Sequence, residues 1–457
     1  MTQWNPDLIR RFGGPGPRYT SYPPATQFHE EVGEEDYRRA VARGNQARRP
    51  LSLYCHIPFC ATVCYYCACN RIITGNRAKA EDYLTFLKQE IKAKAALVDP
   101  QRPVVQMHWG GGTPTYLSDA QMTELVYDLA RHFNLLEEDR GEYAIEVDPR
   151  TVDRARLGLL RGLGFNRLSI GIQDLDPVVQ KAVNREQSLE LITEVFDAAR
   201  DFGFHSINAD MIYGLPWQSS SSLARSLEQL LALRPERISL YNYAHMPARF
   251  KVQRQIQETA LPSPEEKLAI LKLAGETLEE AGYVLIGMDH FALPDDPMAV
   301  AQRNGSLHRN FQGYSLHGDA DLLGMGVSAI SAFDDFYAQN LKVLSNWQEA
   351  VQAGRMPIER GFLLDWDDRL RRDVIMGLLC DLRLDLVAFR QRWEVDFADY
   401  FKDQLAALGE FEKLGLIDMN GPVLKVTDTG RLVVRALVML FDRYAGTPNP
   451  QRFSRII

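Results

Sequence analysis

Three cysteines with the spacing C-x3-C-x2-C, at Cys60, Cys64 and Cys67, are the residues of this sequence best suited to chemistry. They directly follow a short apolar run, and three thiolates on one loop can converge on a small volume. Iron–sulfur clusters are held mainly by thiolates. Three ligands on a cubane of four irons would leave one iron open to a substrate or cofactor. The spacing therefore predicts a [4Fe–4S] cluster with an open iron.

Two other metal sites use clustered thiols. A structural zinc site usually pairs two separated ligand knuckles, and no second Cys or His knuckle is evident in the sequence. A closed cluster of the ferredoxin type needs a fourth cysteine. Cys69 is available for that role, but it lies only two residues after Cys67. Cys55 falls inside a predicted strand and is expected to be structural, and Cys380 is expected to be a buried core residue.

Composition limits the classes of protein that remain. The chain has 457 residues, too many for one ordinary core, and we expect two or three domains. Its formal charge of −8 repels nucleic acid and gives no reason to expect a membrane partner. No apolar run approaches the about 18 residues of a transmembrane helix, and the N-terminus lacks the apolar region of a signal peptide. We therefore expect a cytoplasmic protein, without nucleic acid or membrane as partner, and a monomer.

Strand-like and helix-like patterns alternate from residue 51 onward. Helical patterns at 80–98, 118–133, 188–203 and 222–233 separate the apolar runs. Such alternation predicts a parallel α/β sheet, here a partial (β/α)6 barrel, with a smaller and mainly helical C-terminal domain. The predicted strands are 51–57, 104–109, 143–148, 167–172, 207–214 and 237–244.

Chemically unusual residues follow each of these strands. In a (β/α) barrel, the C-terminal ends of the strands carry the active site. The elements in question are the cysteines, the GGGTP loop at 110–114, Glu146 with Asp148, Gln173 with Asp174, YGLP at 213–216, and Ala244 with His245. We interpret the GGGTP loop and Glu146 as ligand-binding elements, because glycines allow a close approach of backbone and a carboxylate can pair with an ammonium or ribose hydroxyls.

The chain divides into three predicted regions. Residues 1–48 are rich in Gly and Pro around 13–24 and are expected to be an extended, lid-like segment. Residues 49–345 are predicted to form the barrel with the cluster. Residues 358–457 combine helices with a β-ribbon at 416–426 and a last helix from 429 to about 445, which resembles a winged helix. Their almost equal numbers of acidic and basic residues argue against DNA binding, and we expect a packing or lid role.

The cysteine motif resembles that of the radical S-adenosylmethionine (SAM) superfamily, which carries an aromatic residue, here Tyr66, before the last cysteine. The glycine loop resembles the superfamily's SAM-binding loop. In that superfamily the open iron binds the amino and carboxylate groups of SAM, and one electron cleaves SAM to methionine and a 5′-deoxyadenosyl radical. The resemblance implies the same cofactors here.

More of the chain resembles the oxygen-independent coproporphyrinogen III oxidase family. The matching segments are 16–23, 54–60, 67–70, 146–150, 183–186, 210–216, 243–245, 287–291, 308–314 and 324–330, and the likeness extends to RFSRII at 452–457. The family binds two SAM molecules. The resemblance places Tyr54, Gly111, Glu146 and Ile330 at the first, and Tyr66, Gly112, Thr113, Gln173, Arg185, Asp210 and Ala244 at the second. The family often has Phe at the position of Tyr66 and an aliphatic residue at the position of Cys55. Neither difference affects the expected site, because a phenol ring can still stack and Cys55 is not expected to be a cluster ligand. Cys69 follows the family pattern, and we expect it not to bind the cluster.

The resemblance implies a reaction and its partners. Two propionate side chains of coproporphyrinogen III, on rings A and B, would become vinyl groups, giving protoporphyrinogen IX in haem biosynthesis. A reductant for the cluster and a terminal electron acceptor are required. Arg18, Arg303 and Arg309 are candidates to meet the substrate carboxylates. Two rival functions remain at this stage: a related haem chaperone without oxidase activity, and an iron–sulfur electron carrier that does not cleave SAM.

Overall fold

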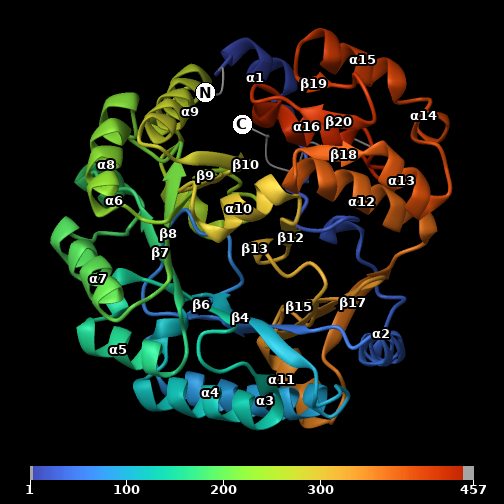
Figure 1. Ribbon diagram of the computed structural model, residues 1–457. Coiled ribbons are helices and arrows are strands. Elements are labelled where there is room, and N and C mark those ends of the chain that lie inside the picture. The colour runs from blue at the N-terminus through green and yellow to red at the C-terminus, as the bar shows by residue number, and fades with distance from the viewer. Residues whose placement is uncertain (1–3, 446–457) are drawn as a thin grey trace.

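Six parallel strands form the centre of the fold. The computed structural model describes residues 4–445. The strands are neighbours in the order of the chain, with a helix on the outer side after each (Figure 1). The strands are β1 (Leu51–Ile57), β4 (Pro103–Gly111), β6 (Glu142–Val147), β7 (Arg167–Gln173), β8 (Ser206–Tyr213) and β9 (Arg237–Asn242). The helices are α3 (Ala78–Ala95), α4 (Asp119–His132), α5 (Arg154–Gly162), α7 (Leu189–Asp201), α8 (Ser220–Leu233) and α9 (Pro264–Glu280). The predicted partial (β/α)6 barrel is confirmed.

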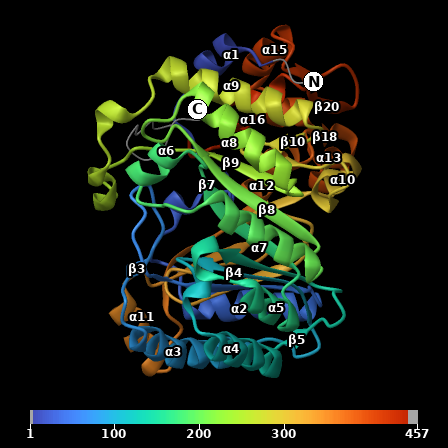
Figure 2. The same ribbon diagram turned by 90° about the vertical axis from the view of Figure 1, so that its left-hand side faces the viewer.

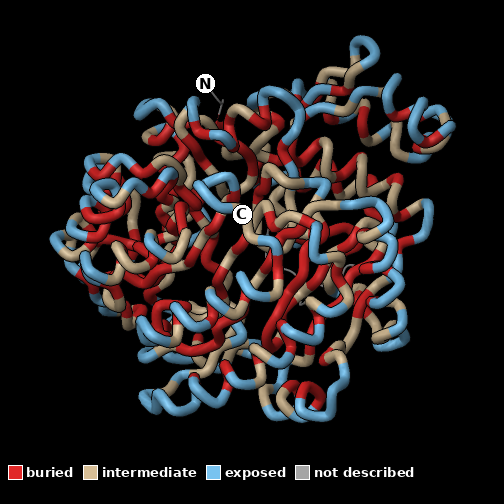
Figure 3. The backbone as a smooth tube through the Cα atoms, turned by 60° about the horizontal axis from the view of Figure 1, so that its bottom comes forward, coloured by how far each residue is buried: buried red, intermediate tan, exposed pale blue. Residues whose placement is uncertain are grey.

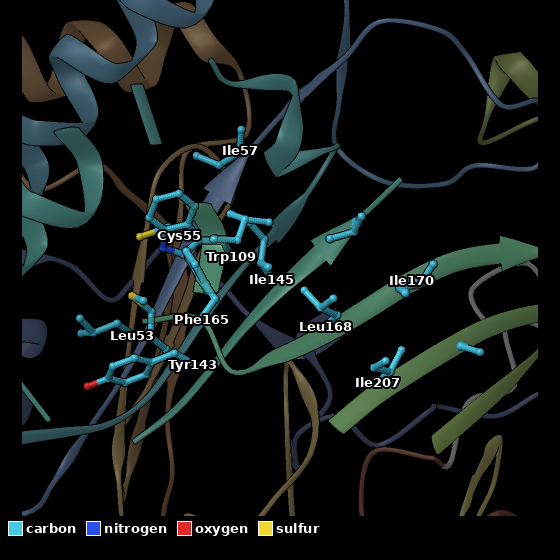
Figure 4. Close-up of a cluster of buried hydrophobic side chains, with 14 of the residues drawn as sticks. Leu53, Cys55, Ile57, Trp109, Tyr143, Ile145, Phe165, Leu168, Ile170 and Ile207 are labelled. Atoms are coloured by element: carbon cyan, nitrogen blue, oxygen red, sulfur yellow. The ribbon is translucent and has the colours of Figure 1, made fainter. Parts of the chain in front are cut away.

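Alternate residues of each strand point to opposite faces of the sheet, as the period of two requires. On β1, Leu53, Cys55 and Ile57 are buried in the apolar core, together with Trp109 and other side chains of the neighbouring strands (Figure 4). Cys55 is therefore a core residue, as predicted. The intervening side chains, such as Tyr54, lie on the inner face of the barrel.

The sheet continues beyond the barrel at both edges. β14 (Asp321–Met325) pairs in parallel with β1 and leads into antiparallel β15 (Ile330–Ala332), β16 (Phe336–Asn340) and β17 (Ile358–Leu363). At the other edge, β10 (Val284–Gly287) and β11 (His290–Ala292) form a hairpin beside β9. A separate hairpin of β12 (His308–Asn310) and β13 (Gly313–Ser315) helps to line the cavity at the starts of the barrel strands. The remaining elements of this region are α6 (Pro177–Ala182), α10 (Pro297–Asn304), α11 (Leu344–Gln352) and the short β5 (Asn134–Leu135).

The N-terminal region differs from the expected extended segment. It contains two helices, α1 (Pro6–Phe12) and α2 (Glu34–Gln46), so the expectation of an irregular chain over residues 1–48 is wrong for both. Helix α2 begins after Gly33, whose N–H donates to the Asp36 carboxylate, and it buries one face against the fold. The Gly- and Pro-rich stretch between the helices is not helical until Ala25, as predicted.

That stretch is firmly packed. Tyr19 and Tyr22 are buried, and the Tyr19 hydroxyl donates to the Asp442 carboxylate at 2.9 Å. The guanidinium of Arg435 donates to the backbone carbonyl of Gly16 at 2.6 Å. Figures 1 and 2 both place α1 beside α15, where the rings of Phe12 and Phe411 are 4.7 Å apart. The two ends of the described chain therefore pack against each other.

The C-terminal part combines helices with a small three-stranded sheet. Its helices are α12 (Trp366–Cys380), α13 (Leu386–Trp393), α14 (Phe397–Tyr400), α15 (Leu405–Lys413) and α16 (Val434–Met439), and its strands are β18 (Arg383–Asp385), β19 (Ile417–Asp418) and β20 (Val423–Val426). Cys380 is buried, as predicted. The predicted ribbon is present, but the last helix is shorter than expected. The matching segment 452–457 lies outside the described residues.

Buried backbone runs through the interior and exposed backbone surrounds it (Figure 3). Within residues 4–445, no helix has both the length and the hydrophobicity to span a bilayer.

A buried ion pair joins helix α3 to the loop between β14 and β15. The Lys94 ammonium lies 2.7 Å from the Glu90 carboxylate, and both side chains are fully buried. Lys94 also donates to the Gly324 carbonyl at 2.5 Å, and Glu90 accepts from the N–H of Gly326 at 2.8 Å and from the Trp347 indole at 3.0 Å. The pair thereby fixes the loop that ends at Ile330.

Substitution of Lys94 by Met should leave Glu90 buried without a cation. Breaking a buried pair from one side costs about 3–5 kcal/mol, so the free energy of unfolding should fall by about that amount in urea titrations. Lys92→Met, on the exposed face of the same helix, should change it by less than about 0.5 kcal/mol. Equal stability of the two variants would contradict this account.

Candidate functional site

The loop with the three cysteines is anchored at both ends. Strands β2 (Phe59–Cys60) and β3 (Ile72–Ile73) pair in parallel and bracket it. In between, the N–H of Tyr65 donates to the Val183 carbonyl at 3.0 Å, and the Asn184 side chain donates to the Val63 carbonyl at 2.7 Å. These bonds tie the loop to the segment that follows α6.

The structure brings most of the predicted site residues to one cavity of about 460 Å³ at the C-terminal ends of the strands. The predicted residues among its walls are Cys60, Cys64, Tyr66, Cys67, Gly111, Gly112, Thr113, Glu146, Gln173, Arg185 and Asp210. They come from the cysteine loop, from β4, β6, β7 and β8, and from the segment after α6. Residues far apart in the sequence thus share one site.

Three predicted residues do not line this cavity. The Tyr54 hydroxyl is hydrogen-bonded to Nδ1 of His56 at 3.0 Å on the inner face of β1. The carbonyl of Ala244 accepts from the side-chain amide of Gln253, which also donates to the Tyr66 carbonyl. Ile330 begins β15. Gln253 therefore links the Ala244 loop to the cysteine loop.

The arrangement of the thiols fits a cluster. In the part of the chain that the structure describes, no three His, Cys, Asp or Glu side chains gather closely enough to hold a single metal ion. Cys60, Cys64 and Cys67 instead lie around the wall of the shared cavity. A cubane would take one iron per thiolate, whereas a zinc ion needs its sulfur ligands within about 2.3 Å of one point.

The environment of the thiols favours ionisation at one of them. A hydrogen bond from Cys69, outweighing burial and aided by the charge of Arg71, lowers the pKa of Cys67 to about 6. Burial raises the pKa of Cys60 to about 11. Thiolates are the form that binds metal, so Cys67 is ready to do so near neutral pH. Cys69 acts as its hydrogen-bond donor.

Arg185 places a guanidinium group next to Cys64. Its Nη1 lies 2.9 Å from the Asp148 carboxylate and 3.7 Å from the Cys64 sulfur, and its Nη2 donates to the Gly171 carbonyl at 2.6 Å. Its buried Nε has no hydrogen-bond partner among residues 4–445. Burial disfavours the charge, but its negatively charged neighbours outweigh burial and raise the pKa of Arg185 above its usual value. The site therefore holds a permanent positive charge beside a predicted cluster ligand.

The glycine loop makes room for the protein's own groups. A Cβ on Gly112 would lie 2.6 Å from the Pro58 backbone, and one on Gly111, where φ is +114°, would lie 2.4 Å from the His56 ring. The N–H of Gly112 donates to the Ile57 carbonyl at 2.8 Å. The glycines thus let the end of β4 lie directly against the segment after β1, and they leave the cavity open on the other side.

Two carboxylates in the cavity have pKa values that are shifted in opposite directions. Burial raises the pKa of Glu146, but hydrogen bonds from His108, at 3.2 Å, and from the N–H of Gly111, at 3.1 Å, outweigh it, so the pKa lies below its usual value. Burial raises the pKa of Asp210 to about 6, although Ser169 donates to it at 2.9 Å. Glu146 is charged at neutral pH, whereas Asp210 titrates just below it.

Sequence reasoning missed several residues of the cavity wall. Arg71 directly precedes β3, whereas Arg150 follows the end of β6 and donates to Asp148 at 2.7 Å. Ser169 and Tyr241 are inward residues of β7 and β9. Strand alternation carries the signal for these two, because each lies at an even spacing from a polar inward residue of its own strand.

Comparison with known proteins gives consistent matches. The model of the radical SAM superfamily matches residues 54–230, and that of the HemN C-terminal domain matches residues 364–433. The oxygen-independent coproporphyrinogen III oxidase of Pseudomonas aeruginosa is 49% identical over 100% of this chain and 99% of its own, and that of Escherichia coli is 49% identical over 99% and 98%. The solved structure of coproporphyrinogen III oxidase (HemN) from Escherichia coli, a radical SAM enzyme, superposes with a TM-score of 0.92 at 48% identity, covering 97% of this chain and 99% of its own.

Cysteine substitutions test the assignment of ligands. Cys60→Ser, Cys64→Ser and Cys67→Ser should each lose the cluster, because each removes one of three thiolates. Cys69→Ser should keep it, since a hydroxyl can still donate a hydrogen bond to Cys67. Iron and sulfide content after anaerobic reconstitution, with the visible absorption of the cluster, provides the measurement. Loss of iron in Cys69→Ser together with retention in Cys67→Ser would reverse the assignment.

Proposed function

The chain belongs to the family of oxygen-independent coproporphyrinogen III oxidases, and we propose that it decarboxylates the propionate side chains of rings A and B of coproporphyrinogen III to vinyl groups, giving protoporphyrinogen IX. The observation that carries the proposal is the single cavity shared by the three thiols, the glycine loop, Glu146, Asp210 and Arg185. Near-complete coverage of relatives with this name supports the oxidase over the haem chaperone.

The cavity residues fit the family's cofactors. Cys60, Cys64 and Cys67 would hold the [4Fe–4S] cluster, and its fourth iron is left for SAM. When bound and reduced, cluster and SAM together supply a 5′-deoxyadenosyl radical. The buried Nε of Arg185, unpartnered within the described chain, is an orphaned donor that suits an anionic group of such a ligand.

We assign the binding of two SAM molecules to the groups around the cavity. The charged carboxylate of Glu146 suits the ammonium of a first SAM, with Tyr54, Gly111 and Ile330 as its other predicted contacts. Tyr66, Gly112, Thr113, Gln173, Arg185, Asp210 and Ala244 are the predicted contacts of the second.

The stoichiometry of the reaction defines the remaining partners. Each propionate gives up one hydrogen atom from its β-carbon, one CO2 and one electron on becoming a vinyl group. The protein therefore needs a terminal electron acceptor in addition to a reductant for the cluster. We propose that it works as a monomer in the cytoplasm, where a reducing environment keeps thiols free. All six cysteines are free in the structure.

An anaerobic assay tests the function directly. Reconstituted protein with coproporphyrinogen III, SAM, dithionite and an added one-electron acceptor should form the monovinyl intermediate and then protoporphyrinogen IX, detected after oxidation by chromatography. Omission of SAM, or use of Cys64→Ser, should abolish product. Tight binding of haem without any product would instead favour the chaperone. Failure to cleave SAM at all would favour an electron carrier.

The pKa of Asp210 predicts a pH effect on SAM binding. Because burial raises this pKa to about 6, the carboxylate is ionised above that pH and protonated below it. If the ionised form binds, the dissociation constant should be about fourfold larger at pH 5.5 than at pH 7.5. The Asp210→Asn variant should bind SAM weakly at both pH values, and its dissociation constant should not change between them. An affinity in the wild type that is the same at both pH values would refute the role of Asp210.

A further inference from the structure

A group of arginines lies at the edge of the barrel beside β9. Arg18 Nη1 lies 3.3 Å from the Asp289 carboxylate, and its Nη2 donates to the Asn242 carbonyl. The guanidinium of Arg309 lies 4.7 Å from the centre of the Tyr314 ring, and its buried Nε and Nη1 have no hydrogen-bond partner in the described part of the chain. Arg435 donates to backbone carbonyls of the N-terminal stretch. The charges of Asp289, Arg18 and Arg309 all act on Arg435, so three guanidinium groups gather near one carboxylate, which is ion-paired with Arg18.

The positive charge of this group affects the pKa of a neighbouring histidine, His290. His290 lies between the ring of Tyr241, at 5.8 Å, and that of Tyr314, at 5.1 Å. Burial and then the charge of Arg309 lower the pKa of His290 to about 3, so this imidazole stays neutral and adds no charge. A buried cation is costly unless an anion or hydrogen bonds compensate it. The two unpartnered nitrogens of Arg309 therefore point to a missing anionic partner.

The arginine group adjoins the cavity of the three thiols through Tyr241. The Tyr241 ring lines that cavity, and its centre is 5.9 Å from the Cζ atom of Arg18. Tyr241 also lines the cavity inside the barrel together with His290 and Tyr314, and the two cavities share Glu146, Ser169, Asp210 and Tyr241. They therefore adjoin, and the guanidinium groups of Arg18 and Arg309 pack on the rings of Tyr241 and Tyr314 in this lining. A ligand that reacts in the cavity can extend its periphery toward them.

We propose that Arg18 and Arg309 form a carboxylate-binding subsite that holds the propionates that do not react. The inference rests on the proposed function, because it assumes as ligand a cyclic tetrapyrrole with four propionates, of which two keep their carboxylates. Guanidinium groups suit this task because they bind carboxylates in two parallel hydrogen bonds. Arg303, the third candidate in the sequence, is exposed on α10 and is not part of the subsite.

Equilibrium binding tests the subsite without turnover. Coproporphyrin III, the stable oxidised tetracarboxylate, is titrated against the cluster-loaded protein, and its fluorescence reports binding. Arg18→Gln and Arg309→Gln should each weaken binding by about 10- to 100-fold, the effect of losing one charge-assisted hydrogen-bonded pair. Arg309→Lys should recover part of the loss. Arg303→Gln, the matched surface control, should bind as the wild type does.

Turnover separates this inference from the proposed function. In Arg309→Gln, KM for coproporphyrinogen III should rise by a similar factor while kcat, cluster content and substrate-free SAM cleavage stay within about twofold of the wild type. Wild-type affinity and KM in both Gln variants, with product still formed by the wild type, would overturn the subsite alone. Absence of product from the wild type would overturn the function on which it rests. Loss of cluster or of SAM cleavage in the Gln variants would show a structural role and also overturn the subsite.

Discussion

The guanidinium of Arg185 holds the cofactor site together by charge. Thiolates and carboxylates gathered around one cavity repel one another, and those that are partly buried lose hydration, so a fixed cation stabilises them. Arg185 supplies it to Asp148 and to Cys64, while its bond to Gly171 fixes it to β7. One side chain therefore ties the cysteine loop to the ends of two barrel strands. The same side chain therefore both positions the cysteine loop and compensates the negative charge of its neighbours.

The inner face of the barrel shows why such a site can exist in this fold. Its inward residues are polar on several strands, in contrast to the apolar face under the helices. The charges there are matched: Arg167 lies 2.6 Å from Glu142 and Arg237 lies 2.9 Å from Asp296. Hydrogen bonds from Ser169 and Asn208 to Asp210 continue the pattern toward the strand ends. Buried polar side chains are stable only when they are paired in this way. The paired interior lets the barrel carry a polar cavity for charged ligands.

Much of this organisation is predictable from sequence because it is local. The six strands are visible as apolar runs, and the rule that active sites lie at strand ends is enough to bring Cys60, the GGGTP loop and Glu146 to one place. Asp210 lies inside β8, and only the family resemblance pointed to it. Helix α2 was missed although its buried residues Tyr37, Ala40, Val41 and Gly44 recur at helical spacing, because the Gly- and Pro-rich stretch before it dominated the interpretation of residues 1–48. The contact of Arg18 with Asp289 joins residues 271 positions apart and leaves no local pattern. Likewise, the glycine loop lines the cavity, but its close packing against Pro58 and His56 joins separate segments and leaves no local pattern.

The packing of the first residues against the last has a consequence for biosynthesis. Arg435 holds the carbonyls of Gly16 and Pro17, next to Arg18, and Tyr19 is bonded to Asp442. During translation the barrel strands leave the ribosome long before residue 435 does. A nascent chain can thus complete its cysteine loop while the arginine group beside β9 is still without its final support. The order of synthesis then separates maturation of the metal site from competence toward the substrate, and a chain that stops early would carry the first without the second.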